Sequence, residues 1–117
     1  MINTIVVGGG QAGIALSYFL KQYGVEHLIL ERDRAFFAWH NRWDSFRMNT
    51  ANWMNILPGK QEPFAPSRPW YDVATCEEAL DYFRAYIQMV DPPLKEGVAV
   101  TQIAEGERAY TRLNANI

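Results

Sequence analysis

A run of glycines near the amino terminus is the pattern with the clearest chemistry in this sequence. Residues 8–13 are Gly-Gly-Gly-Gln-Ala-Gly, which has the spacing G-x-G-x-x-G. Gly8 would allow a sharp turn, and Gly10 would let the backbone approach a phosphate closely. Gly13 would let the following helix pack tightly on a sheet, with the free N–H groups of the helix directed at an anion. The turn therefore predicts a site for the pyrophosphate of a dinucleotide.

The segments on either side have the order that such a turn requires. Residues 4–7 include the apolar run Ile5-Val6-Val7, which is typical of a buried parallel strand. A second apolar strand over residues 27–31 ends in Glu31, at about the spacing where an acid accepts hydrogen bonds from ribose hydroxyls. Between the strands, apolar residues at steps of three and four predict one helix face, and Gly24 would end the helix. That face comprises Ala12, Ala15, Leu16, Phe19, Leu20 and Tyr23.

This context distinguishes between several kinds of glycine turn. A lone G-x-G-x-x-G also occurs in ordinary turns, but here the strand, the helix and the terminal acid agree. A P-loop is disfavoured because no Gly-Lys-Ser/Thr follows, and a kinase glycine loop is disfavoured because a helical pattern follows. We therefore expect an α/β protein whose parallel sheet starts with a βαβ unit.

Size and charge exclude several classes of protein. The chain has 117 residues, a formal net charge of −2 and 49% hydrophobic residues, enough for one domain with a core. No basic patch points to nucleic acid, and no apolar run approaches the length that spans a membrane. The first strand begins close to Met1, which leaves no room for a signal peptide. A cytoplasmic location is the default expectation.

Disulfide and metal chemistry are also not expected. The single cysteine, Cys76, excludes an internal disulfide framework and falls on the apolar face of a predicted helix, as a buried structural thiol would. Neither His27 nor His40 has a cysteine or a second histidine at ligand spacing, so no metal site is predicted.

Residues 32–74 form a long segment without sustained periodicity. A structureless segment of this length in a compact domain is usually functional, for example as a binding loop or lid. Trp39, Trp43 and Trp53 fall close together within it. They would either stack on a flat ligand or pack against the sheet.

Regular structure is predicted to resume after this segment. A helix would begin after Thr75, which forms a capping box with Glu78, and would end before Pro92. Residues 97–103 are rich in β-branched residues and predict a third parallel strand, and residues 108–111 are expected to begin another strand. The apolar stripe of the helix would comprise Cys76, Leu80, Phe83, Ile87 and Val90.

From about Thr4 to about Ile103, the chain resembles the amino-terminal part of flavin-containing monooxygenases. More broadly, it is similar to flavoprotein oxidoreductases with two dinucleotide-binding domains. The resemblance rests on the opening unit, on residues 39–50 (Trp-His-Asn-Arg-Trp-Asp-Ser-Phe-Arg-Met-Asn-Thr) and on Leu57-Pro58-Gly59. It implies FAD as the cofactor. In that family NADPH reduces FAD, and the reduced flavin activates oxygen for transfer to a small-molecule substrate, which these residues do not name.

The resemblance also implies roles for individual residues. The glycine turn would hold the pyrophosphate, Glu31 would bind the adenosine ribose and Val100, on the third strand, would meet the adenine through its backbone. Trp39 and its neighbours would line the path towards the flavin ring, and Asn49 would be the candidate catalytic residue beside the reactive edge of the flavin. The implied cofactor-binding residues are Gly8, Gly10, Gln11, Ala12, Gly13, Glu31, Arg32, Trp39, Arg42, Trp43 and Val100.

Two features depart from the family pattern. Family members usually carry a glycine pair before the tryptophan, where this chain has Phe36 and Phe37. Their bulk is expected to crowd the pyrophosphate or to shift the loop. The sequence also lacks a second G-x-G-x-x-G, which in the family would hold NADPH. We therefore expect residues 1–117 to form a partial, truncated Rossmann-like FAD-binding domain with strand order 3-2-1, not catalytically complete alone.

Two other functions stay open at this point. The same turn would serve a small NAD-binding dehydrogenase-type module, in which Glu31 favours the free 2′-hydroxyl of NAD. Alternatively, the chain would be a non-enzymatic partner subunit. In the expected strand order, the strand over residues 5–7 lies at the edge of the sheet, where it could pair with another chain or with a second copy.

Overall fold

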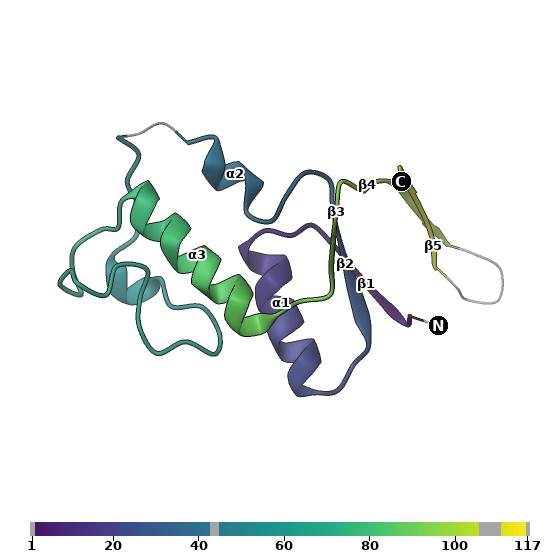
Figure 1. The fold of residues 1–117 in the computed structure, drawn as a ribbon, viewed down its shortest axis with the longest axis horizontal. Helices are drawn as coiled ribbons and strands as arrows, with labels where there is room; N and C mark the ends of the chain where they lie inside the picture. The colour runs from purple at the N-terminus through teal and green to yellow at the C-terminus, as the bar shows by residue number, and fades with distance from the viewer. Residues whose placement is uncertain (1, 43–44, 106–110, 117) are drawn as a thin grey trace.

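The first third of the chain forms the βαβ unit that its glycine turn predicts. The computed structural model describes residues 2–42, 45–105 and 111–116. Strand β1 (Thr4–Val7), helix α1 (Gln11–Gln22) and strand β2 (His27–Glu31) follow one another as expected (Figure 1). The remaining elements are α2 (Phe37–His40), η1 (Asn52–Met54), α3 (Cys76–Val90), β3 (Leu94–Glu96), β4 (Ala99–Glu105) and β5 (Thr111–Asn116).

The central sheet has three parallel strands in the order β1-β2-β3, which confirms the predicted order 3-2-1. Helices α1 and α3 lie side by side next to this sheet (Figure 1). The ammonium group of Lys21 on α1 donates to the carbonyls of Val90 and Asp91 at the end of α3, at 2.7 and 2.8 Å. A cation is favourable there because the last carbonyls of a helix carry partial negative charge.

The third parallel strand lies earlier in the sequence than we predicted. Residues 94–96 pair with β2, whereas residues 99–105 leave the sheet and form an antiparallel ribbon with β5. Gly97, at φ 75°, turns the chain between the two strands. The β-branched run was correctly expected to be a strand, but strand propensity does not specify a pairing partner. Thr111 begins β5, and residues 108–110 lie outside the described ranges.

The predicted apolar face of α1 is largely wrong, although Leu20 packs against the core as expected. Leu16, Phe19 and Tyr23 are 47%, 46% and 81% exposed, whereas Ile14 and Ser17 are fully buried. The face that meets the sheet is set by the close contact at Gly13, and Ile14 and Ser17 continue that face along the helix. The buried face includes the polar residue Ser17, so a pattern that counts only apolar residues does not identify it.

Ser17 is buried without loss of hydrogen bonding because it pairs with His27. The imidazole Nδ1 donates to the carbonyl of Val25 at 2.8 Å, since a carbonyl can only accept. The other ring nitrogen, Nε2, then accepts from the Ser17 hydroxyl at 2.7 Å. This buried pair joins α1 to the start of β2, where His27 was expected.

Aromatic side chains from α3 and from the 32–74 segment fill the core. Helix α3 buries Cys76, Phe83 and Val90 as predicted, but Leu80 and Ile87 are only half-buried. Tyr82 and Tyr86 are buried instead, and their hydroxyls donate to the carbonyls of Glu62 and Pro58 at 3.1 and 2.7 Å. Burial raises the pKa of Tyr86 to about 12. These hydrogen bonds tie the irregular segment to the helix.

The irregular segment is packed rather than loose. Asn52 is fully buried, and its side-chain amide donates to the carbonyl of Ala65 at 2.7 Å. Its side-chain oxygen accepts from the N–H of the same residue at 3.1 Å. A buried amide therefore satisfies backbone groups that have no helix or sheet partner here.

The predicted capping box at the start of α3 is confirmed. The Thr75 hydroxyl accepts from the Glu78 N–H at 3.2 Å, and Glu78 Oε1 accepts from the Thr75 N–H at 2.9 Å. The Arg68 guanidinium also donates to the Glu78 carboxylate, at 2.7 and 3.0 Å. Burial by itself raises the pKa of Glu78, but the hydrogen bonds from Thr75 and Arg68 outweigh it and lower this pKa below its ordinary value.

We expect Glu78→Gln to lower the free energy of unfolding at pH 7 by about 1 kcal/mol, because a half-exposed charged hydrogen bond is lost. A depressed carboxyl pKa stabilises the folded state above the ordinary value of 4.5, and this contribution disappears as the pH falls further. The free energy of unfolding, measured with urea, should therefore fall more below about pH 4.5 in the wild type than in the variant. Glu77→Gln, on the exposed side of the same turn, is the control; an equal effect there would contradict the assignment.

Candidate dinucleotide-binding site

The three motif glycines have three different environments. Gly8 has φ 103°, a left-handed conformation that lets the chain turn out of β1. A Cβ on Gly13 would lie 2.0 Å from the Gly8 carbonyl oxygen, so no other residue fits there. A Cβ on Gly10 would meet nothing within 4 Å, so this glycine borders open space at the start of α1. The turn and close packing predicted for Gly8 and Gly13 are therefore present.

The middle glycine, Gly9, was not among the predicted site residues, yet both of its backbone polar groups are hydrogen-bonded and its Cβ position is crowded. Its N–H donates to Glu31 Oε1 at 2.9 Å, and its carbonyl accepts from the Phe36 N–H at 2.9 Å. A Cβ on Gly9 would lie 3.1 Å from Glu31 Cγ and 3.3 Å from a Leu94 methyl group. The signal in the sequence was that a glycine also occupies the variable position between Gly8 and Gly10.

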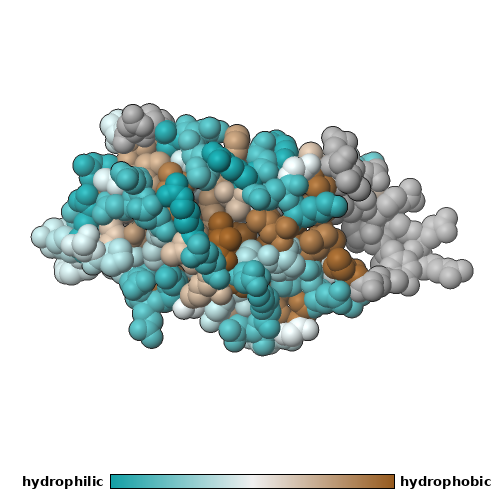
Figure 2. Space-filling model, in the orientation of Figure 1, coloured by the Kyte–Doolittle hydropathy of each residue, from teal (hydrophilic) through white to brown (hydrophobic). Residues whose placement is uncertain are grey.

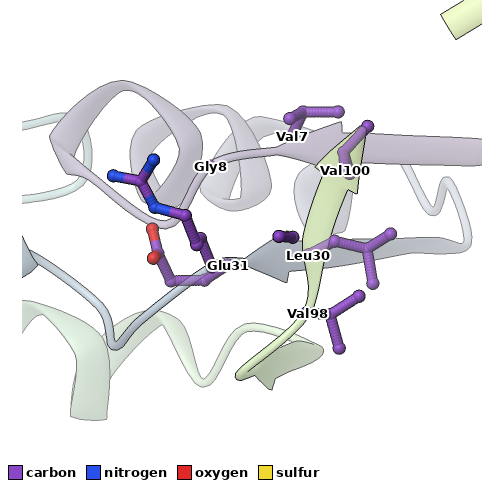
Figure 3. A pocket seen from close by; sticks show the side chains of 8 residues that line it. Val7, Gly8, Leu30, Glu31, Val98 and Val100 are labelled. Atoms are coloured by element: carbon purple, nitrogen blue, oxygen red, sulfur yellow. The ribbon is translucent and has the colours of Figure 1, made fainter. Parts of the chain in front are cut away.

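A cavity of about 260 Å³ lies at the carboxyl ends of β1 and β2, beside the glycine turn. We call it the β1–β2 cleft. Figure 3 shows the Glu31 carboxylate at one side of the cleft and the aliphatic side chains at the other. The cleft brings together four predicted residues, Gly8, Glu31, Arg32 and Val100, although Val100 belongs to β4 and not to the third parallel strand. Its other lining residues, which the sequence analysis missed, are Val7, Leu30, Val98 and Ala99.

Glu31 is held so that it retains capacity for a ligand. Its second oxygen, Oε2, accepts from the Asp33 N–H at 2.6 Å. An ionised carboxylate has about four acceptor positions, so two backbone bonds leave positions for hydroxyl donors. The neighbouring Arg32 is exposed and pairs with Asp33 at 3.1 Å.

The tryptophan segment lines a different cavity. Trp39 packs edge-to-face against Phe46 and Phe83, and the Arg42 guanidinium lies over the Trp39 and Phe46 rings at 5.4 and 4.9 Å. A cavity of about 370 Å³ opens between α2 and α3 here. We call it the α2–α3 cavity; it is lined by Trp39, His40, Arg42, Cys76, Glu77, Leu80 and Arg84. Trp39 and Arg42, two of the predicted path residues, thus line a cavity other than the β1–β2 cleft.

Two further residues from the sequence analysis, His40 and Asn49, can be placed. Burial lowers the pKa of His40, and the charges of Arg34 and Arg84 lower it further. Asn49 is exposed and lines neither cavity. Trp43 lies outside the described residues.

The expected crowding by Phe36 is not found. Its ring is 2% exposed and stacks on Phe83 in the core, with ring centroids 4.2 Å apart. Only the backbone of Phe36 meets the glycine turn, whereas Phe37 is half-buried.

The described ranges contain neither a membrane-spanning helix nor a metal-binding cluster. No helix there is long and apolar enough to cross a membrane. No group of three or more histidine, cysteine or acidic side chains in those ranges could hold a metal ion.

Comparison with known proteins identifies the type of fold. Residues 1–54 match the family model described as FAD binding domain. The chain is 28% identical over 111 residues to an uncharacterized CzcO-like oxidoreductase of Geobacillus kaustophilus, covering 94% of this chain and 31% of that protein. It is 30% identical over 100 residues to an uncharacterized CzcO oxidoreductase of Bacillus subtilis, covering 81% and 27%.

A solved structure gives the same result. A mutant flavin monooxygenase from Stenotrophomonas maltophilia superposes with a TM-score of 0.80 at 28% identity, over 97% of this chain and 33% of that chain. The chain thus spans about a third of the length of the relatives that it matches. In fold and in sequence it resembles the FAD-binding part of flavin monooxygenases and related FAD-dependent oxidoreductases, and FAD is the cofactor that the matching family model names.

Proposed function

We propose that the chain binds FAD with its adenosine end in the β1–β2 cleft, as the FAD-binding part of an NAD(P)H-dependent monooxygenase-like oxidoreductase. One observation carries the proposal. The hydrogen bond from the Gly9 N–H to Glu31 joins the glycine turn, which is suited to a phosphate, to the acid that is suited to a ribose. The turn and the acid together border the open space at Gly10 and the cleft.

The cleft and the neighbouring start of α1 suit different parts of FAD. The start of α1, with Gln11 and Ala12 after the open Gly10, would hold the pyrophosphate through backbone N–H groups. The free acceptor positions of Glu31 would bind the ribose hydroxyls. The aliphatic wall of Leu30 and Val98, with Val100 on β4, would cover the adenine.

We further propose that Trp39, Arg42 and Trp43 line the path towards the flavin ring and that Asn49 lies near its reactive edge. The exposure of Asn49 leaves it accessible to a ring extending from the cleft. Bound FAD would supply the redox chemistry, and this chain would supply position and orientation.

We expect Gly10→Ala to weaken FAD binding about tenfold or more while leaving the fold intact. The new methyl group meets no protein atom within 4 Å, so the loss of stability should stay within about 1 kcal/mol, the effect of alanine at a helix N-cap. The methyl would instead occupy space that the pyrophosphate needs. Flavin fluorescence titration measures the affinity, and thermal unfolding is the control.

The wild-type titration also separates FAD from the NAD alternative. FAD should bind more tightly than NAD, and a flavin absorbance band should accompany the purified protein. Stabilisation by NAD without flavin binding would contradict the FAD proposal and favour a dehydrogenase-type module.

We expect the 117-residue chain to bind FAD without oxidising NADPH at an enzymatic rate. The reason is that the sequence holds one G-x-G-x-x-G and no second one for NADPH. Absorbance at 340 nm, followed with FAD and NADPH present, is the measurement. Robust FAD-dependent NADPH consumption would show that the chain is catalytically complete.

A second candidate function is association through the edge strand. Strand β1 lies at the edge of the described parallel sheet, and its Ile5 and Val7 are 37% and 51% exposed. Figure 2 shows hydrophobic surface over the region of this sheet. An apolar edge strand is suited to pair with another chain or with a second copy. Light scattering at several concentrations tests this function, and a monomer throughout would count against it.

A further inference from the structure

Phe36 has a backbone conformation that bulky residues rarely adopt. Its φ and ψ are 58° and 28°, in the left-handed region. A residue with a Cβ is strained there, and glycine is the residue that adopts this conformation without cost. Such strain persists only where the surrounding structure enforces it, and it gathers at functional sites.

The strained conformation directs the Phe36 N–H at the glycine turn. This N–H donates to the Gly9 carbonyl at 2.9 Å. The other polar group of Gly9, its N–H, is held by Glu31. The preceding residue is fixed as well, since the Ala35 N–H donates to the Glu96 carboxylate on β3 at 2.7 Å.

The ring of Phe36 packs in the core, and this packing holds the backbone of Phe36 in place. It lies parallel to the Phe83 ring, at an interplanar angle of 1° and a centroid distance of 4.2 Å. Phe83 is itself 1% exposed and meets Trp39 and Phe64 edge-on, at 5.0 and 5.1 Å. The aromatic core of α3 thus opposes relaxation of Phe36 to an ordinary conformation.

We propose that Phe36 is a positioning residue that locks the glycine turn in its ligand-binding form, with the lock held by stacking on Phe83. The consequence for cofactor affinity rests on the proposed FAD function. No contact between the Phe36 side chain and the cofactor is involved. The lock links the core at α3 to the pyrophosphate end of the β1–β2 cleft.

Two substitutions at one position separate this role from simple core packing. Phe36→Leu keeps much of the buried apolar volume but loses the ring stack and retains the strain of a side chain at positive φ. Phe36→Gly loses more volume but adopts the left-handed conformation freely. Stability should therefore fall more in the glycine variant, whereas the turn should be better preserved in it. Phe64→Leu, in the same aromatic core but without a bond to the turn, is the matched control.

FAD titration of the full 117-residue chain is the first measurement. We expect Phe36→Leu to weaken FAD binding about 5- to 30-fold, the range set by the left-handed penalty. Phe36→Gly and Phe64→Leu should stay within about twofold of the wild type, because the turn keeps its form in both. Weaker FAD binding by Phe36→Gly than by Phe36→Leu, which would follow the order of stability, would overturn the lock. An equal loss of FAD affinity in Phe64→Leu and Phe36→Leu would also overturn it.

Amide hydrogen exchange of the ligand-free chain tests the lock without FAD. Exchange at the position-36 N–H is compared with exchange at the Ile29 N–H, which is bonded to the Pro93 carbonyl. The exchange rate at position 36 divided by the rate at Ile29 should rise in Phe36→Leu. In Phe36→Gly it should stay near the wild-type value. If the two variants show this pattern but the wild-type chain binds no FAD, the proposed function is refuted and the lock stands. A ratio unchanged in both variants would refute the lock itself.

Discussion

The two hydrogen bonds on the backbone of Gly9 are the constraint on which the candidate dinucleotide site depends. Through its N–H, Gly9 fixes the Glu31 carboxylate at the end of β2, and through its carbonyl it fixes the chain at Phe36. The side of Gly9 is crowded by the side chains of Glu31 and Leu94, so a larger residue would require these side chains to shift. With Gly9 held, Gly10 is left facing open space and α1 starts in a defined direction, which is the arrangement that an anionic ligand requires.

The aromatic core serves the same site from a distance. Helix α3 lies beside α1 and is joined to it through Lys21. Its ring at Phe83 meets both Phe36, at the start of α2, and Trp39, within α2, so α3 supports this short helix. The tyrosine hydroxyls on the same helix hold the irregular segment by its carbonyls. The long irregular segment, which contains the short helices α2 and η1, is thereby held against α3.

The sequence predicted those parts of the molecule in which local chemistry decides the structure. The glycine spacing, the terminal acid at Glu31 and the capping box at Thr75 each specify a backbone arrangement within a few residues. It did not predict choices that depend on distant partners. The buried face of α1 includes Ser17, whose burial needs His27 as a partner, and the third strand is the short β3 because pairing with β2 is a tertiary contact. Phe36 was misjudged for the same reason, since its backbone meets the turn while its ring lies in the core.

Backbone chemical shifts during an FAD titration test the central claim most directly, because they report where the cofactor lies rather than only whether it binds. The account predicts that the largest shifts fall on the N–H groups of residues 8–13, Glu31 and Val100, with smaller ones along Trp39 and Arg42. Shifts confined to the α2–α3 cavity, or no shifts at the glycine turn at saturating FAD, would contradict it.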